Sequence, residues 1–182
     1  MSWKPTDTIL ALDIASVAGW CEGPIHGPLQ YGSQRFAPEG SSDAAVGFGA
    51  LKWLGQRLQA FRPRIIAFEA PLNPHMMRGK TNRKTLRRLA GLPFVVEAVA
   101  YGSGVYDLRE VEVGDLRHYW LGARNIPGDR AKRMIRDKLR ALGHDPKDLD
   151  ASDAIAVHRF IAATIDPALR VEPLSLLRGA TS

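Results

Sequence analysis

Apolar runs separated by turn residues predict five strands. The run Thr8–Ile14 is rich in branched side chains and has the length of a buried strand. Further strands are expected at Trp20–Glu22 and Leu29–Phe36, and Arg64–Glu69 is a second buried-looking run. Val105–Val113 alternates apolar with polar residues, which is typical of a partly exposed strand. We expect the first three strands to form an antiparallel meander and the helix-linked strands to pair in parallel.

Apolar positions at helical spacing predict the helices that link and follow these strands. Helices are expected over residues 43–61, 80–99 with a break near Pro93, 115–120, 130–142 and 148–165. The pattern is that of an α/β fold with a central mixed five-stranded sheet flanked by helices. No repeat or linker divides the chain, so residues 1–182 are expected to form a single domain, with a loosely packed tail from about residue 166.

Four carboxylates interrupt apolar surroundings. Asp13 and Glu69 lie at or near the ends of the two buried strands, where open α/β sheets place their sites. Asp150 and Asp153 are three residues apart and therefore share one face of the last helix. By themselves these two residues could be a helix N-cap and a charge that favours the helix dipole.

Taken together, the four carboxylates suggest a metal site and not a helix cap. Carboxylates converging from two strands and a helix repel one another in a low dielectric unless cations neutralise them. Oxygen ligands suit Mg²⁺ or Mn²⁺ rather than zinc. Two such ions are the usual apparatus for phosphodiester hydrolysis. The interpretation is a site holding two Mg²⁺ ions, with Mn²⁺ able to substitute.

The composition of the chain limits the cellular compartment and the kind of binding partner that we expect. The single cysteine, Cys21, excludes an internal disulfide framework, so we expect a cytoplasmic protein, and no apolar stretch is long enough to predict a membrane span. The formal net charge is +6, which favours a polyanionic partner. Six basic residues without an acid form what we call the basic segment: Arg78, Lys80, Arg83, Lys84, Arg87 and Arg88. This segment is either a solvated helix face or a set of DNA phosphate contacts.

Three motifs resemble those of the RuvC family of Holliday-junction resolvases. They are Ile9-Leu10-Ala11-Leu12-Asp13-Ile14-Ala15-Ser16 followed by Gly19, Ile65-Ile66-Ala67-Phe68-Glu69, and Asp150-Ala151-Ser152-Asp153-Ala154-Ile155-Ala156. Their order and spacing match the family. The chain departs from it at Ala15, where the family commonly has glycine, so the geometry of this turn is in question.

The resemblance implies an RNase H-like fold, a homodimer and Mg²⁺-dependent nicking of four-way DNA junctions. It implies that Asp13, Glu69, Asp150 and Asp153 are the metal ligands and the catalytic residues. The segment from Pro71 to Arg88 matches the part of the family that enters the junction, so the basic segment is expected to bind DNA. Arg117 and Lys132 match basic substrate contacts.

Other hypotheses stay open. The same fold and metals could act on other branched DNA or on RNA–DNA hybrids, and a non-catalytic DNA-binding module would also account for the basic segment. An ATPase of the actin-like superfamily shares a first strand that ends in Asp, but it requires a second phosphate loop that this sequence lacks. His158 lies on a different side of the last helix from Asp153, which favours a surface or supporting role.

Overall fold

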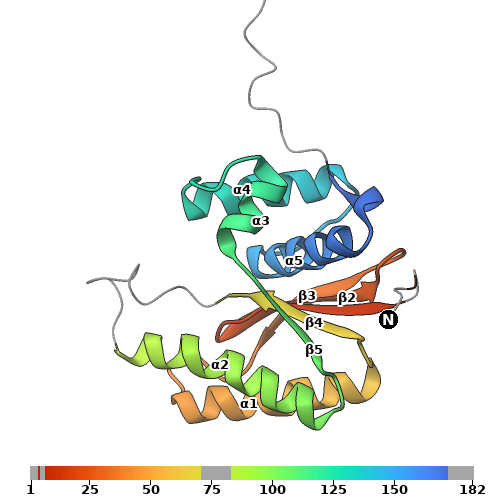
Figure 1. Cartoon of the computed structure of the whole chain (residues 1–182). Helices are drawn as coiled ribbons and strands as arrows, with labels where there is room; N and C mark the ends of the chain where they lie inside the picture. The colour runs from red at the N-terminus through yellow and green to blue at the C-terminus, as the bar shows by residue number, and fades with distance from the viewer. Residues whose placement is uncertain (1–3, 5–6, 71–82, 172–182) are drawn as a thin grey trace, which may run out of the picture.

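A computed structural model shows three layers, with helices on both sides of a central sheet (Figure 1). The structure describes residues 4, 7–70 and 83–171, and within the helix that begins at residue 83 it describes the side chains of 87, 88 and those from 90 onward. In the described part of the chain no helix is long and apolar enough to cross a membrane.

The sheet has five strands in the order β3-β2-β1-β4-β5. The strands are β1 (Thr8–Asp13), β2 (Val17–Pro24), β3 (Gln30–Arg35), β4 (Ile65–Glu69) and β5 (Asp107–Val111). β1, β2 and β3 pair antiparallel, whereas β4 pairs in parallel with both β1 and β5. The mixed five-stranded sheet is therefore confirmed. β2 begins at Val17, earlier than predicted, so the turn after β1 is only three residues long.

Helices α1 (Asp43–Ala60) and α2 (Arg83–Gly102) cover one face of the sheet, and α3 (Val113–Leu121), α4 (Gly128–Ala141) and α5 (Leu149–Ile165) lie on the other side (Figure 1). A short 3-10 turn, Pro167–Leu169, follows α5. The predicted break near Pro93 is wrong, because α2 runs through that residue. Leu92 and Val96 are buried on either side of it, and this packing outweighs the lost backbone hydrogen bond.

Side-chain alternation along β1 and β4 assigns every residue to one of two cores. Ile9, Ala11, Ile65 and Ala67 pack in a cluster with α5, whereas Leu10, Leu12, Ile66 and Phe68 pack with α1 and α2. Asp13 and Glu69 each follow two residues after a member of the first set, so the period of two directs both carboxylates toward α5. Leu12 pairs with Phe68 across the two strands, which brings the acids that follow to the same level of the sheet.

Candidate active site

The two strand acids lie at the carboxyl ends of neighbouring parallel strands. Asp13 ends β1 and Glu69 ends β4. Burial, together with the negative charge of Asp153, raises the pKa of Asp13 to about 7, although Lys132 acts in the opposite direction. Burial and Asp153 likewise raise the pKa of Glu69. These strand ends therefore hold carboxylates whose charges are insufficiently compensated.

The two helix acids lie in the first turns of α5, and neither is its cap. Asp148 is the N-cap, and its Oδ1 accepts a hydrogen bond from the backbone N–H of Ala151 at 2.8 Å. The hydroxyl of Ser33 donates to Asp148 Oδ2 at 2.7 Å, which fixes the helix start against β3. The interpretation of Asp150 as the N-cap is therefore wrong. Its carboxylate, like that of Asp153, has a pKa that burial raises.

A glycine in β2 allows α5 to approach the acidic strand end. Gly19 pairs with Asp13 across β1 and β2. A Cβ atom at residue 19 would lie 1.8 Å from the carbonyl oxygen of Asp150, far inside contact distance. Only glycine leaves room for the helix backbone here. The sequence motif already contained Gly19, but its role depends on a helix that begins about 130 residues later in the chain.

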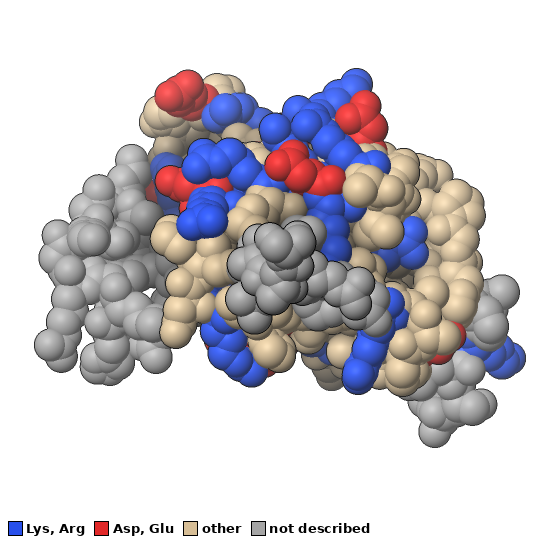
Figure 2. Space-filling view, turned by 90° about the horizontal axis from the view of Figure 1, so that it is seen from above, with Lys and Arg blue, Asp and Glu red and all other residues tan. Residues whose placement is uncertain are grey.

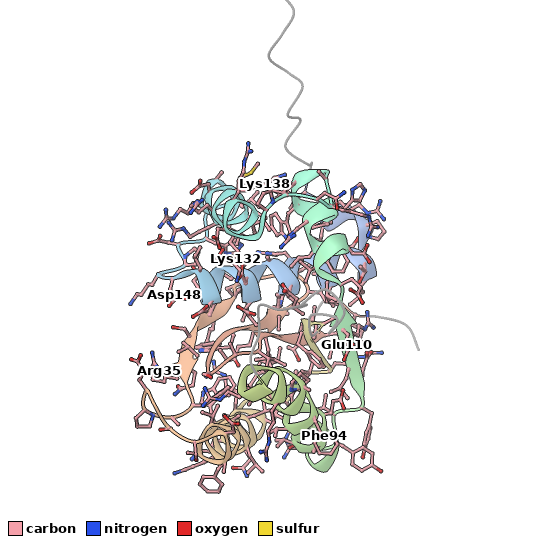
Figure 3. The ribbon with its side chains drawn as sticks, turned by 90° about the vertical axis from the view of Figure 1, so that its left-hand side faces the viewer. Arg35, Phe94, Glu110, Lys132, Lys138 and Asp148 are labelled. Carbon is pink, nitrogen blue, oxygen red and sulfur yellow. The ribbon has the colours of Figure 1, made fainter. Side chains whose placement is uncertain are left out.

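Two basic residues lie beside the acids. Lys132 of α4 makes an ion pair with Asp153, whose side chain is only 7 % exposed, and Figure 3 shows Lys132 between α4 and α5. Burial alone would lower the pKa of Lys132, but Asp153, Asp13 and Glu69 outweigh that effect and the pKa is raised. The charge of Arg117 lowers the pKa of both Glu69 and Asp153. Of the basic residues predicted to contact DNA, Arg117 and Lys132 thus lie near the acids.

The donor set fits a hard divalent cation in its chemistry and its charge. All four acids offer carboxylate oxygens, and Asp13 feels the negative charges of the other three. Among the residues that the structure describes, no three His, Cys, Asp or Glu side chains are gathered as a ready metal site. Lys132, with a smaller contribution from Arg117, compensates the charge of Asp153 in this arrangement.

The basic segment is described only in part. Arg78 and Lys80 lie outside the described residues, and so do the side chains of Arg83 and Lys84. Arg87 is exposed. Arg88 points inward, where it bonds to Asp43, to the backbone carbonyl of Ser41 and to Ser16.

The side of the molecule formed by α3 and α4 is also rich in basic residues. Figure 2 shows Lys and Arg side chains gathered on this face, with fewer acidic side chains between them. Three exposed arginines of α4 contribute to that composition: Arg130, Arg133 and Arg140. Ion pairs neutralise part of the charge, because Arg124 binds Asp115 at 2.6 Å. A polyanion could therefore approach the acids along α4 without facing a uniformly negative surface.

No protein-family model and no curated protein matches the sequence. Among solved structures, the chain is similar to Thermus thermophilus RuvC, with a TM-score of 0.63 and 15% identity over 92% of this chain and 99% of that one. T. thermophilus RuvC in complex with a Holliday junction substrate gives a TM-score of 0.65 and 14% identity, covering 87% of this chain and 93% of that one.

The yeast mitochondrial Holliday junction resolvase Ydc2 is similar as well. Its TM-score is 0.59 and its identity 12%, over 85% of this chain and 77% of that one. The chain thus has the RNase H-like fold of the RuvC structures, as the motifs predicted.

Proposed function

We propose that this protein is a structure-selective DNA endonuclease that resolves four-way junctions by metal-dependent phosphodiester hydrolysis. The observation that carries the proposal is that Asp13 and Glu69 end the neighbouring strands β1 and β4, and that Asp13 feels the negative charges of Glu69 and of Asp150 and Asp153 on α5. The similarity to a RuvC structure bound to a Holliday junction supports the choice of substrate.

The proposed cofactor is Mg²⁺, with Mn²⁺ able to substitute and two ions per site. Asp13, Glu69, Asp150 and Asp153 would hold the ions, because uncompensated carboxylates bind hard cations through oxygen. Bound ions of this kind activate a water molecule and stabilise the leaving oxygen of a phosphodiester.

The basic residues near the acids are proposed to bind the scissile phosphate. The Lys132 side chain is 42 % exposed, so its ammonium can donate to a phosphate oxygen that approaches Asp153. Arg117 adds positive charge on the same side of the site. Together they would orient the phosphate and lower the repulsion between the acids and the DNA backbone.

Outside the site, we propose that the basic segment apart from Arg88, whose donors are directed to protein oxygens, contacts the DNA backbone, and that two copies of the chain form a homodimer. A four-way junction has two equivalent strands to be cut, and a homodimer supplies one site for each. Binding through phosphates predicts that affinity falls steeply as salt rises.

A cleavage assay tests this proposal. Purified protein is incubated with a labelled four-way junction in Mg²⁺, in Mn²⁺ or in EDTA, beside Glu69→Gln and with linear duplex, three-way DNA and an RNA–DNA hybrid as competing substrates. We expect paired nicks in the four-way junction with either metal and none in EDTA or with Glu69→Gln. If another substrate is cut faster than the four-way junction, that substrate is the target. Binding of the junction without cleavage in either metal would favour the non-catalytic DNA-binding module.

A further inference from the structure

We propose that Arg88 is a positioning residue, which holds the turn after Asp13 against α1 and α2 instead of contacting DNA. The inference rests on the proposed nuclease function, since its consequence is the placement of the Asp13 carboxylate. It also separates Arg88 from the rest of the basic segment, in which the neighbouring Arg87 is exposed.

The guanidinium of Arg88 bonds to three separate places in the chain. Its Nε donates to Asp43 Oδ1 at 2.5 Å and one terminal nitrogen donates to the backbone carbonyl of Ser41 at 2.9 Å. The other terminal nitrogen lies 3.4 Å from the hydroxyl of Ser16, a weaker contact. Ser16 belongs to the three-residue turn between β1 and β2, and Asp43 begins α1. A planar fork of donors can connect the three positions, which a lysine ammonium cannot reproduce.

The groups that Arg88 binds are themselves fixed. Ser42 caps α1, and its hydroxyl accepts the backbone N–H of Ala45 at 3.2 Å. Asp43 is therefore in the first turn, where the helix dipole favours a negative charge. The backbone carbonyl of Ser16 accepts the N–H of Phe36 at 3.1 Å, which ties the turn to the end of β3. Arg88 thus joins two anchored segments to α2.

An apolar contact supports the same connection. Ile14, which directly follows Asp13, packs in a small cluster with Val46 and Ala50 of α1 and with Leu92 of α2. Leu92 lies four residues after Arg88, so both face the same side of α2. One turn of α2 therefore holds the turn after β1 through a polar contact and the next turn holds it through an apolar one. The direction of the Asp13 side chain depends on this support.

Arg88 acts from the side of the sheet opposite to the acids. Lys132 is the cation that lowers the pKa of Asp13, and it approaches from the α5 side. The Arg88 guanidinium lies on the α1–α2 side and is 25 % exposed, with its donors directed to protein oxygens. It is thus poorly placed to bind a DNA phosphate. Its effect on the reaction passes through the position of the turn.

Arg57 provides a matched control. It is a second half-buried arginine, 21 % exposed, that pairs with a carboxylate, because its Nε lies 2.8 Å from Glu22 Oε2. Its guanidinium also stacks on the ring of Trp20, 3.5 Å from the centroid. Glu22 pairs with Leu10, three residues before Asp13 along β1. Arg57 therefore supports the same layer through β2, by its contacts with Glu22 and Trp20, and not through the turn.

The test compares Arg88→Met, Arg88→Lys and Arg57→Met in the full chain. Single-turnover cleavage of a labelled four-way junction is measured in Mg²⁺ at saturating enzyme, binding is measured in EDTA, and both are done where circular dichroism shows every variant folded. For Arg88→Met we expect a rate about 10- to 100-fold lower with affinity within about two-fold of wild type, since small misplacements cost this much. Arg88→Lys should recover part of the rate. Arg57→Met should lower Tm and keep the rate.

Three cleavage or binding results, and one hydrogen-exchange result, would overturn the inference. Weaker binding by Arg88→Met at an unchanged rate would make Arg88 a DNA contact. An Arg88→Met variant with wild-type rate and affinity would show that Arg88 has no role in cleavage. An equal loss of rate in Arg57→Met would show that the loss comes from general destabilisation of the fold. If the wild type leaves every junction intact, the proposed function fails. Backbone hydrogen exchange then tests the positioning role of Arg88 without relying on cleavage. Exchange at residues 14–17 should increase in Arg88→Met and not in Arg57→Met, and unchanged exchange in Arg88→Met would show that Arg88 does not hold the turn after Asp13.

Discussion

The two faces of the sheet differ in how far their acidic side chains are neutralised by basic residues. On the α1–α2 face two half-buried arginines each pair with a carboxylate, Arg88 with Asp43 and Arg57 with Glu22. On the α5 face Asp13 and its three acidic neighbours share the charge of Lys132. Both faces are built on the same strands and bury apolar side chains of the same kinds. The difference therefore arises at the strand ends, where one face gains acids without equal compensation.

This contrast indicates which face is scaffold and which is site. Half-buried ion pairs between one arginine and one carboxylate contribute modestly to stability, and their charges need no additional counter-ion. Uncompensated buried carboxylates lower the stability of the fold, and they persist in proteins mainly where function requires them. The α1–α2 face therefore serves to hold the strand ends in place, and the α5 face to bind cations and phosphate under the proposed function.

Removing one acid should have the largest effect. We expect Asp13→Asn to lower the cleavage rate on the order of a thousand-fold or more, because the amide cannot replace the carboxylate charge at the centre of the site. The same change should raise Tm in EDTA, since it removes a repelling charge whose pKa burial and Asp153 raise. Asp43→Asn on the scaffold face is the matched control and should lower Tm. A normally cutting Asp13→Asn contradicts the mechanism.

Displacing α5 should come next. Gly19→Ala places a methyl group 1.8 Å from the carbonyl oxygen of Asp150, so helix and strand must separate. We expect the free energy of unfolding to fall by about 1–3 kcal/mol, as for overpacked cores, and the cleavage rate to fall about 100-fold. Denaturant titration and single-turnover cleavage measure the two effects.

Gly47→Ala is the control for this substitution. Residue 47 lies within α1, and apart from its chain neighbours and the adjoining backbone of this helix no atom lies within 4 Å of a Cβ placed there. Alanine should stabilise the helix by up to about 1 kcal/mol and leave cleavage unchanged. If the two alanine variants behave alike, the close approach of α5 to β2 is not what places the acids.

Removing the shared cation should have an intermediate effect. Lys132→Met leaves Asp153 buried without its ion pair, so we expect Tm to fall in EDTA and the cleavage rate to fall about ten-fold or more. Lys132→Arg keeps the charge and should retain most of the stability. A loss of affinity with no change in rate would show that Lys132 binds DNA away from the scissile phosphate.

The sequence predicted the site better where it depends on local periodicity. Asp13 and Glu69 were assigned to strand ends, and alternation along each strand is enough to direct them to one face. The sequence suggested Asp150 as the cap of α5, although aspartate at position 148 gives the same local pattern. Only the backbone of Ala151, bonded to Asp148, separates the two.

Contacts between distant segments could not be predicted in this way. The bond from Arg88 to Asp43 joins residues 45 positions apart, and a run of basic residues carries no sign that one member turns inward. The strand start at Val17 was missed because Gly19 reads as a turn residue, although a close helix backbone is what requires it. His158 was expected at the surface or beside the site, yet it is completely buried.

Replacing His158 should have the smallest effect, a change in the pH dependence of stability. It compares two parts of the α5 face, the part that holds the acids and the part around His158. Its Nε2 lies 3.3 Å from the carbonyl oxygen of Gly23, and burial, reinforced by the charges of Arg159 and His144, lowers its pKa to about 4. The unfolded chain has a histidine pKa near 6.5, so between about pH 4 and 6.5 the unfolded state binds the extra proton. The stability that neutral His158 contributes is therefore complete above about pH 6.5 and is lost as the pH falls toward 4.

His158→Gln isolates this term from the acids, whose raised pKa values act in the opposite direction. The free energy of unfolding of wild type minus that of the variant should rise by about 1.4 kcal/mol per pH unit at most across this window and become constant above it. Denaturant titrations of both proteins at pH 5, 6, 7 and 8 measure the difference. A difference that does not change with pH would mean that His158 is protonated as easily in the folded protein as in the unfolded chain, and that the remote part of the α5 face does not exclude charge.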